Sequence, residues 1–130
     1  MDFRQGDIFF YEPPTEDFSQ QGSLFVASGS EQMGHRPYVI VSVGAVHDHK
    51  PTVVGVPLTT KIDKANSYRI NLPSAELIPV PGRSAFANSV ALCDHVRVLD
   101  KQRLRAKAGR LSDNANLAVG LGLAYVFDLR

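Results

Sequence analysis

The pattern of apolar and polar positions predicts a chain of short β-strands separated by polar turns. The run at 38–43 is continuously apolar, so we expect a central strand buried on both faces. Pro57 predicts that the ladder of the third strand ends there. Two polar segments, 15–30 and 73–88, are predicted to be long loops. The other strand-type runs, rich in β-branched and aromatic residues, are 8–11, 52–58, 68–72, 89–93 and 95–99.

A helix is predicted near the C-terminus, where Ser112 or Asp113 can cap the first turn. Gly120 and Gly122 within it predict close packing against a sheet. The positions expected to face the core are Ala115, Leu117, Ala118, Leu121 and Ala124, followed by the run Tyr125-Val126-Phe127. Many short strands and one terminal helix favour a small, twisted antiparallel sheet or barrel.

The segment from Lys101 to Arg110 is rich in basic residues and is predicted to be a solvated helix face. Asp100 is expected to cap a short helix over the first part of this segment, because its carboxylate can accept orphan backbone donors. Residues 108–111 are predicted to form a small strand that leads into the C-terminal helix.

Composition narrows the class of protein. The 130 residues are 44% hydrophobic and 21% charged, which predicts one ordered domain, residues 1–130, with a single core. The formal net charge of +1 excludes a strongly basic nucleic-acid coat, so a polyanion would need a local basic patch. Cys93 is the one cysteine, which excludes an internal disulfide and fits a reducing compartment. With no apolar signal region at the N-terminus, we expect a cytoplasmic protein.

The candidate chemistry centres on Arg36, which stands where a polar, glycine-bracketed segment (29–34) meets the apolar run at 38–43. Pro37 removes a backbone donor and biases Arg36 toward an extended conformation. An arginine fork held between a loop and a rigid strand is well suited to binding a phosphate. A solvated arginine at a strand start is the alternative that spacing leaves open.

Two other features have ordinary interpretations. The sequence His47-Asp48-His49 offers too few ligands for a zinc site and is predicted to be a solvated turn. Cys93 is predicted to be a small core residue. We therefore expect neither a metal site nor a cofactor.

Four motifs together resemble one known family. They are Gly6-Asp7-Ile8, the segment 29–37 ending in His35-Arg36-Pro37, the segment 57–62 beginning Pro57-Leu58-Thr59, and the segment 89–104 that includes Asp100-Lys101-Gln102-Arg103-Leu104. This set, spanning roughly Arg4 to Asp128, resembles the MazF/PemK family of toxin ribonucleases (mRNA interferases). The resemblance implies a mainly β (α+β) fold, an SH3-like barrel of the CcdB/PemK type with a C-terminal helix. It also implies a homodimer that cleaves single-stranded messenger RNA without a metal, and an antitoxin whose acidic, disordered tail occupies the RNA groove.

The resemblance also implies catalytic roles. Arg36 matches the family's catalytic arginine, whose fork stabilises charge on the phosphorane. Thr59 matches its threonine, which donates to a phosphate oxygen or helps to relay a proton, although a strand-end threonine bonded to its own backbone is the bland alternative. Some members carry an arginine and an aspartate two residues apart, where this chain has Leu92 and Asp94. Asp94 is a candidate base or orienting group for Arg36, but Leu92 removes the second cation.

Other residues are candidates for substrate binding. Ser30, Glu31 and Gln32 offer donors and acceptors for the edges of unstacked bases, and Phe25 can stack on a base. His35 titrates near neutrality but should point away from Arg36 in an extended chain. His95, beside Asp94, is a candidate RNA contact.

Two further interpretations stay open. The same barrel occurs in gyrase-targeting toxins of the CcdB type, because a fold does not determine a function. Alternatively, the chain is a catalytically silent member that binds RNA or antitoxin, an interpretation that rests on Leu92 and the enlarged loop before Gly29.

Overall fold

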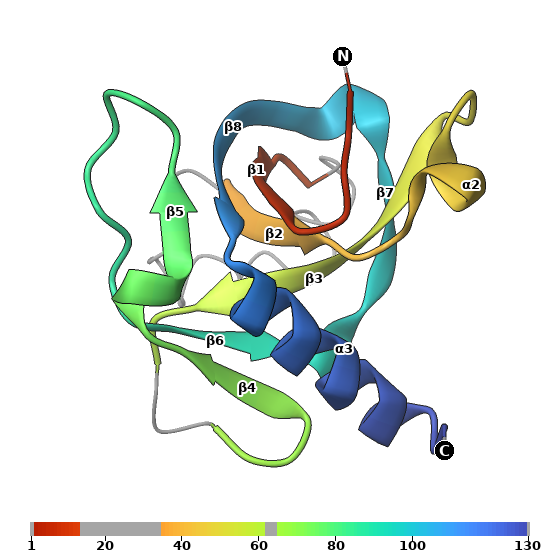
Figure 1. Cartoon of the computed structure of the whole chain (residues 1–130). Helices are drawn as coiled ribbons and strands as arrows, with labels where there is room; N and C mark the ends of the chain where they lie inside the picture. Colours follow the sequence, from red (N-terminus) through yellow and green to blue (C-terminus); the bar gives the residue numbers. More distant parts are fainter. Residues whose placement is uncertain (1, 14–34, 62–64, 130) are drawn as a thin grey trace, which may run out of the picture.

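The computed structural model describes residues 2–13, 35–61 and 65–129. In these ranges a curled antiparallel sheet in the order β4-β6-β3-β2-β1-β8-β5 is crossed by a C-terminal helix, with β7 paired to β3 (Figure 1). The strands are β1 (Asp7–Tyr11), β2 (Arg36–Ile40), β3 (Thr52–Thr59), β4 (Arg69–Leu72), β5 (Leu77–Pro79), β6 (Ser89–Leu92), β7 (Arg97–Asp100) and β8 (Leu104–Leu111). The helices are α2 (Gly44–His47) and α3 (Asp113–Val126), and the 3₁₀ turns are η2 (Ser74–Glu76), η3 (Cys93–His95) and η4 (Lys101–Arg103). The expected mainly β barrel with a C-terminal helix is confirmed.

Strand β3 changes partners along its length, which is how one sheet curls into a barrel. Its first half pairs with β7, as in Thr52 with Asp100, and its middle pairs with β2, ending at Pro57 with Tyr38. Its last two residues pair with β6. The prediction that the ladder ends at Pro57 is therefore right for the pairing of β3 with β2. It is wrong for β3 as a whole, because Leu58 and Thr59 pair with β6.

Alternation along β1 divides the core into two clusters, one on each face of the sheet. Ile8 faces the cluster that α3 covers, and Phe9 and Tyr11 face the other. The first cluster contains Ile8, Val39, Val56, Leu58, Ala91, Ala115 and Val119 among others, and the second contains Phe9, Tyr11, Tyr38, Ile40, Val53, Leu99 and Leu104. We call the face of the second cluster the tyrosine face.

Helix α3 begins at the predicted cap. The Ser112 hydroxyl accepts a hydrogen bond from the Ala115 amide at 3.0 Å and donates one to the Glu76 carboxylate. Gly122 lets the helix approach Ile70 and Cys93 so closely that a Cβ would lie 2.8 Å from each side chain, as predicted. The same prediction is wrong for Gly120, where a Cβ would meet nothing within 4 Å.

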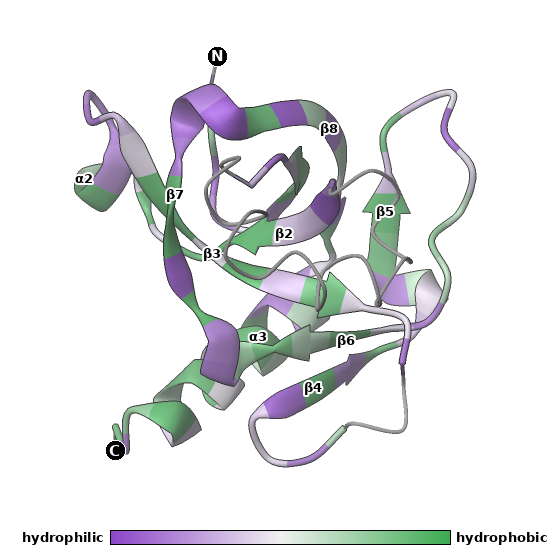
Figure 2. Ribbon diagram, turned by 180° about the vertical axis from the view of Figure 1, so that it is seen from behind, coloured by the Kyte–Doolittle hydropathy of each residue, from purple (hydrophilic) through white to green (hydrophobic). Residues whose placement is uncertain are grey.

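The predicted core face of α3 is partly wrong. Ala115, Val119 and Gly122 are the buried positions, which also recur at helical spacing. Several large residues assigned to the core are exposed instead: Leu117, Leu121, Tyr125 and Phe127. Apolar residues thus occupy both buried and exposed positions of α3, much of which is coloured hydrophobic in Figure 2, so the sequence pattern gives no unique face to bury.

The basic segment is a strand and not the predicted solvated helix face. Only its first residues form a turn, η4, which Asp100 caps as expected by accepting from the Gln102 amide at 2.9 Å. The remainder is β8, whose exposed Arg105 and Lys107 pair with Glu12 and Asp7 across the sheet. The strand buries Leu104, Ala108 and Leu111 and exposes its charged residues, as expected for a strand with one face toward solvent.

The apolar segment 38–43 and the polar segment 73–88 also differ from the expectations. The strand expected at 38–43 ends at Ile40, and Val43 is exposed ahead of α2. The segment 73–88 was predicted to be a loop but contains η2 and β5. Gly109 allows the β5 backbone to pack, because a Cβ there would lie 2.2 Å from the Ile78 carbonyl oxygen. The predicted loop at 15–30 lies outside the described residues.

No helix in the described ranges is long and apolar enough to span a bilayer.

Candidate active site

Strand register places Arg36 and Thr59 on one face of the sheet, at the start of β2 and the end of β3. Arg36 opens β2 and is the Cα partner of Tyr11 on β1. The ladder of β2 with β3 ends at Tyr38 with Pro57, and Arg36 and Thr59 each lie two residues beyond this last pair. Because side chains alternate along a strand, Tyr11, Arg36 and Thr59 share the tyrosine face. The two residues that the sequence assigned to catalysis thus lie in one row, although they are far apart in the chain.

The surroundings of Thr59 leave its hydroxyl hydrogen available. The residue is half-buried at the end of β3, where it pairs with Val90 of β6. Its Oγ1 accepts a long hydrogen bond of 3.3 Å from the Lys61 amide. This is the hydrogen bond between a strand-end threonine and its neighbouring backbone that the alternative interpretation predicted. In it the Thr59 Oγ1 acts only as an acceptor. The hydroxyl can therefore still donate to a phosphate oxygen.

Two tyrosines that sequence reasoning missed line the same row. Tyr11 and Tyr38 are 3% and 4% exposed, and their rings meet edge to face with centroids 5.3 Å apart. The Arg97 guanidinium lies 5.7 Å from the Tyr11 ring centroid. Burial raises the pKa of Tyr11, and the opposing charges of Arg97 and Arg103 do not cancel that effect. The phenol is consequently a neutral hydrogen-bond donor at physiological pH.

Asp94 is paired with Arg69, which the sequence did not single out. The Arg69 guanidinium donates from Nε to Oδ1 at 3.0 Å and from Nη2 to Oδ2 at 2.7 Å. Arg69 is also the Cα partner of Leu92 on the neighbouring strand. The cation that appeared to be missing at Leu92 is therefore supplied across the ladder, in a fork-to-fork pair. Asp94 therefore has a cation beside it although the preceding strand carries Leu92, and the catalytic role of the pair stays a prediction.

His95 lies beside this pair. Its Nε2 is 3.3 Å from Arg69 Nη2 and 3.6 Å from Asp94 Oδ2, and about half of the side chain is exposed. Hydrogen bonding by Arg69 lowers the pKa of Asp94 below its usual range. The cluster of Arg69, Asp94 and His95 thus presents a fixed carboxylate and an accessible imidazole on the η3 turn.

The pairing predicts a pH effect that can be measured. Because the pKa of Asp94 is lowered in the folded state, the pair stabilises the fold above the usual aspartate pKa, and this contribution is lost as the pH falls through the lowered pKa. In Arg69→Ala we expect the pKa of Asp94 to rise. An NMR titration of the Asp94 carboxyl carbon measures it, and Arg105→Ala is the matched control. An unchanged Asp94 titration in Arg69→Ala would contradict the assignment.

The structure describes only some of the remaining residues that the sequence singled out. Phe25, Ser30, Glu31 and Gln32 lie outside the described residues. His35 is half-buried immediately before β2. Cys93 is fully buried and its pKa is raised by burial to about 11, which agrees with a core thiol.

His47 is buried in α2 and is not in a solvated turn as predicted. The Ser42 hydroxyl donates to its Nδ1 at 2.8 Å, and its Nε2 donates to the Phe3 carbonyl at 2.7 Å. Ser42 in turn accepts from the Val54 amide at 3.0 Å. Both ring nitrogens are therefore occupied in joining the N-terminal segment to β3. Among the described residues no cluster of three or more His, Cys, Asp or Glu side chains is placed to hold a metal ion.

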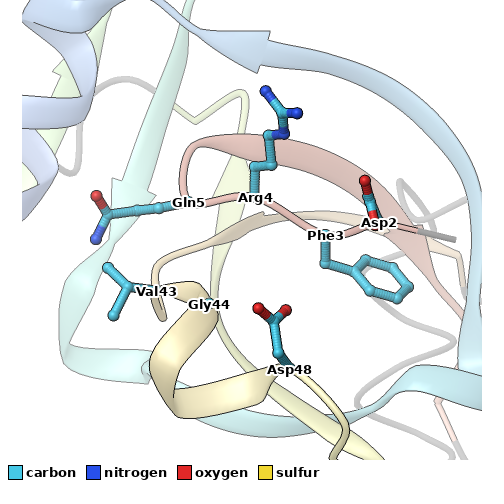
Figure 3. Close-up of a pocket in the computed structure, with 7 residues that line it drawn as sticks. All are labelled: Asp2, Phe3, Arg4, Gln5, Val43, Gly44 and Asp48. Atoms are coloured by element: carbon cyan, nitrogen blue, oxygen red, sulfur yellow. The ribbon is translucent and has the colours of Figure 1, made fainter.

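A pocket of about 320 Å³ lies between the N-terminal segment and the start of α2. Residues of the N-terminal segment line one side of it, and Val43, Gly44 and Asp48 line the other, with the Arg4 side chain pointing away from Asp48 (Figure 3). The pocket does not include any of the candidate catalytic residues.

Comparison with known proteins defines the class. Residues 4–127 match the model of the PemK-like, MazF-like toxins of type II toxin–antitoxin systems. A relative from Staphylococcus saprophyticus subsp. saprophyticus, named Endoribonuclease MazF, is 31% identical over 126 residues, 92% of each chain. The chain belongs to this PemK-like, MazF-like toxin family.

Solved structures agree on the fold. The Mycobacterium tuberculosis toxin MazF-mt6 superposes with a TM-score of 0.67 at 18% identity, covering 95% of this chain and 98% of that one. The MazF of a MazE–MazF complex from Deinococcus radiodurans gives 0.63 at 18% identity, covering 99% and 97%. A mycobacterial endoribonuclease in complex with its cognate antitoxin gives 0.60 at 17% identity, covering 98% and 95%. These toxins share the curled sheet and the C-terminal helix.

Proposed function

We propose that this toxin is a metal-independent endoribonuclease that cleaves single-stranded messenger RNA in the cytoplasm at a short recognition sequence. The observation that carries the proposal is the row of Arg36 and Thr59 on one face of the barrel. Membership of the family and the name of the staphylococcal relative support the same reaction.

The reaction is an internal transesterification. The 2′-oxygen attacks the adjacent phosphorus and loses its proton, the bond from phosphorus to the 5′-oxygen breaks, and that oxygen gains a proton. The products are a 2′,3′-cyclic phosphate and a 5′-hydroxyl. Arg36 holds the phosphate oxygens with its fork, an interaction that strengthens as charge develops on the phosphorane. Thr59 donates its hydroxyl hydrogen to the same phosphate.

The lowered pKa of Asp94 changes the role assigned to it. A carboxylate that binds its proton weakly is a poor base for a ribose hydroxyl. We therefore assign Asp94 to holding Arg69 in place on the side of the sheet where β4 and β6 meet. Arg69 and the half-exposed His95 then extend the RNA path beyond the row of Arg36 and Thr59. Phe25, Ser30, Glu31, Gln32 and His35 are retained as base-reading candidates.

The test is cleavage of RNA in EDTA. Wild-type protein incubated with a long single-stranded RNA is expected to cut at a recurrent sequence and leave 2′,3′-cyclic phosphate ends, mapped by end-specific ligation and sequencing. A metal chelator should leave the rate unchanged. Intact RNA after incubation with folded wild-type protein would refute the activity and favour a silent, binding member of the family.

The same face also suits an antitoxin. Arg36, Arg97 and Arg103 gather around Tyr11 on it, so an acidic peptide would meet several cations there. We propose that the partner antitoxin inhibits by laying an acidic, disordered tail along this groove. The mycobacterial structure named above is a complex with its cognate antitoxin, and the Deinococcus radiodurans structure is a MazE–MazF complex.

Helix α3 supports assembly into a homodimer. Leu117, Leu121 and Tyr125, spaced four residues apart, form a stripe in which each side chain is more than 60% exposed. The Tyr68 ring stacks on Tyr125 with centroids 5.9 Å apart and extends this stripe toward β4. Such a continuous apolar patch is typical of a protein interface, and we propose that a second copy of the chain covers it.

Leu121→Lys tests the dimer. A charge in the middle of the apolar stripe should prevent association without disturbing the core, because Leu121 is exposed in the single chain. Light scattering at micromolar concentration should then give half the mass of the wild type. Ala106→Lys, which adds the same charge on exposed β8, is the control and should stay dimeric. A monomeric wild type would disprove the dimer.

A further inference from the structure

Strand β4 divides its side chains between the two faces of the sheet. Tyr68, just before the strand, stacks on Tyr125 of α3, and Ile70 packs against the cluster that α3 covers. Because side chains alternate along a strand, Arg69 and Asn71 lie on the opposite, tyrosine face. Asn71 is exposed there. Asparagine is disfavoured in strands, so the formation of β4 does not account for it.

Strand register connects Asn71 to Thr59. Val90 of β6 is the Cα partner of both residues, with Asn71 on one side and Thr59 on the other. Asn71 is therefore about 10 Å from Thr59, at roughly 4.8 Å for each step between neighbouring strands. Val90 is fully buried, so the polar side chains at this level of the sheet are those of Thr59 and Asn71. A nucleotide that flanks the phosphate at Thr59 is within reach of Asn71.

The side chain of Asn71 differs in chemistry from the charged groups beside it. Two residues earlier on the same face, the Arg69 guanidinium is bound to Asp94 next to His95. The amide of Asn71 is uncharged, and it offers an acceptor oxygen and a donor NH₂ group in one plane. This pattern matches the N6 and N7 edge of adenine, with which asparagine can make two hydrogen bonds. Single-stranded RNA can be read in this way, because its unstacked bases present their edges to the protein.

We propose that Asn71 is a specificity-determining residue whose side-chain amide hydrogen-bonds the edge of an adenine that flanks the cleaved phosphate. The inference rests on the proposed RNA cleavage and names one base of the recognition sequence. Arg36 and Thr59 engage a phosphate, which is the same in every nucleotide, whereas Asn71 contacts a base. Asn71 therefore contributes to the choice of cleavage site and not to the chemical step.

Mapping of cleavage sites tests the assignment. Wild-type protein should cut a long single-stranded RNA pool with an adenine preference of about tenfold at one position flanking the cleaved phosphate, as expected for a bidentate contact. Asn71→Ala should lose the preference at that position and keep the preferences at the others. Asn114→Ala removes the same side chain from an exposed position on α3, on the other side of the sheet. This control should keep the full wild-type pattern.

Two further experiments give results that a folding defect cannot produce. Asn71→Asp keeps the shape of the side chain but makes it an acceptor only, so the preferred base should change from adenine to cytosine, whose N4 amino group is a donor. A synthetic RNA with 7-deazaadenine at the selected position lacks the N7 acceptor. It should lower kcat/KM severalfold for the wild type and leave kcat/KM of Asn71→Ala unchanged.

The outcomes separate this inference from the proposed function. An unchanged adenine preference in Asn71→Ala, or a rate loss in Asn71→Ala that is equal at all sites, would overturn the assignment while leaving the cleavage reaction standing. A wild type that cleaves RNA without selecting adenine at any flanking position would do the same. If the wild type leaves every RNA intact, the proposed function fails, and the role of Asn71 fails with it.

Discussion

Arg36→Ala is expected to lower kcat for RNA cleavage about 10²–10³-fold, the usual cost of losing one donor to a developing oxyanion. Arg36 shares a face with Thr59 and is the Cα partner of Tyr11, so it stands between these two residues in the sheet. Because the interaction strengthens in the transition state, KM should change much less than kcat. Single-turnover cleavage of a labelled RNA measures the chemical step directly.

Two further variants make this result specific. Arg36→Lys keeps the charge but not the planar fork, so it should restore little of the lost rate. Arg105→Ala removes the same charge from a side chain that is paired with Glu12 on the outer surface, and it should cleave at nearly the wild-type rate. Full cleavage by Arg36→Ala would remove the arginine from the mechanism.

Local signals in the sequence predicted much of the fold. Most strands, the Ser112 cap and the Asp100 cap depend on residues close together in the chain, and each appears where it was expected. The face of α3 did not follow from such signals. Leu117 and Leu121 are as apolar as any core residue, and the buried side is the one on which Ala115, Val119 and Gly122 pack against the sheet. If a second copy covers the exposed stripe, the sequence pattern would describe the dimer more faithfully than the single chain.

The candidate site was predictable only where a motif carried it. Arg36, Thr59 and Asp94 came from such motifs, but Arg69 did not, because its relation to Asp94 depends on the pairing of β4 with β6. Tyr11 and Tyr38 were assigned simply to strands, since only the pairing of β1 with β2 places them on the face of Arg36. Leu92 illustrates the limit best. A missing cation in one strand was supplied by its cross-strand neighbour, which is a property of register and not of spacing along the chain.

Thr59→Ala is expected to reduce kcat by about 10²-fold, and Thr59→Ser to remain within a few-fold of the wild type, because serine keeps the donating hydroxyl. Both changes leave β3 paired through backbone atoms with β6. The informative measurement is the double variant. If Arg36 and Thr59 act on one phosphate as a unit, Arg36→Ala combined with Thr59→Ala should cleave about as slowly as Arg36→Ala alone. Rate losses that multiply would show two independent contributions, and the shared row would then be a matter of position without a shared phosphate.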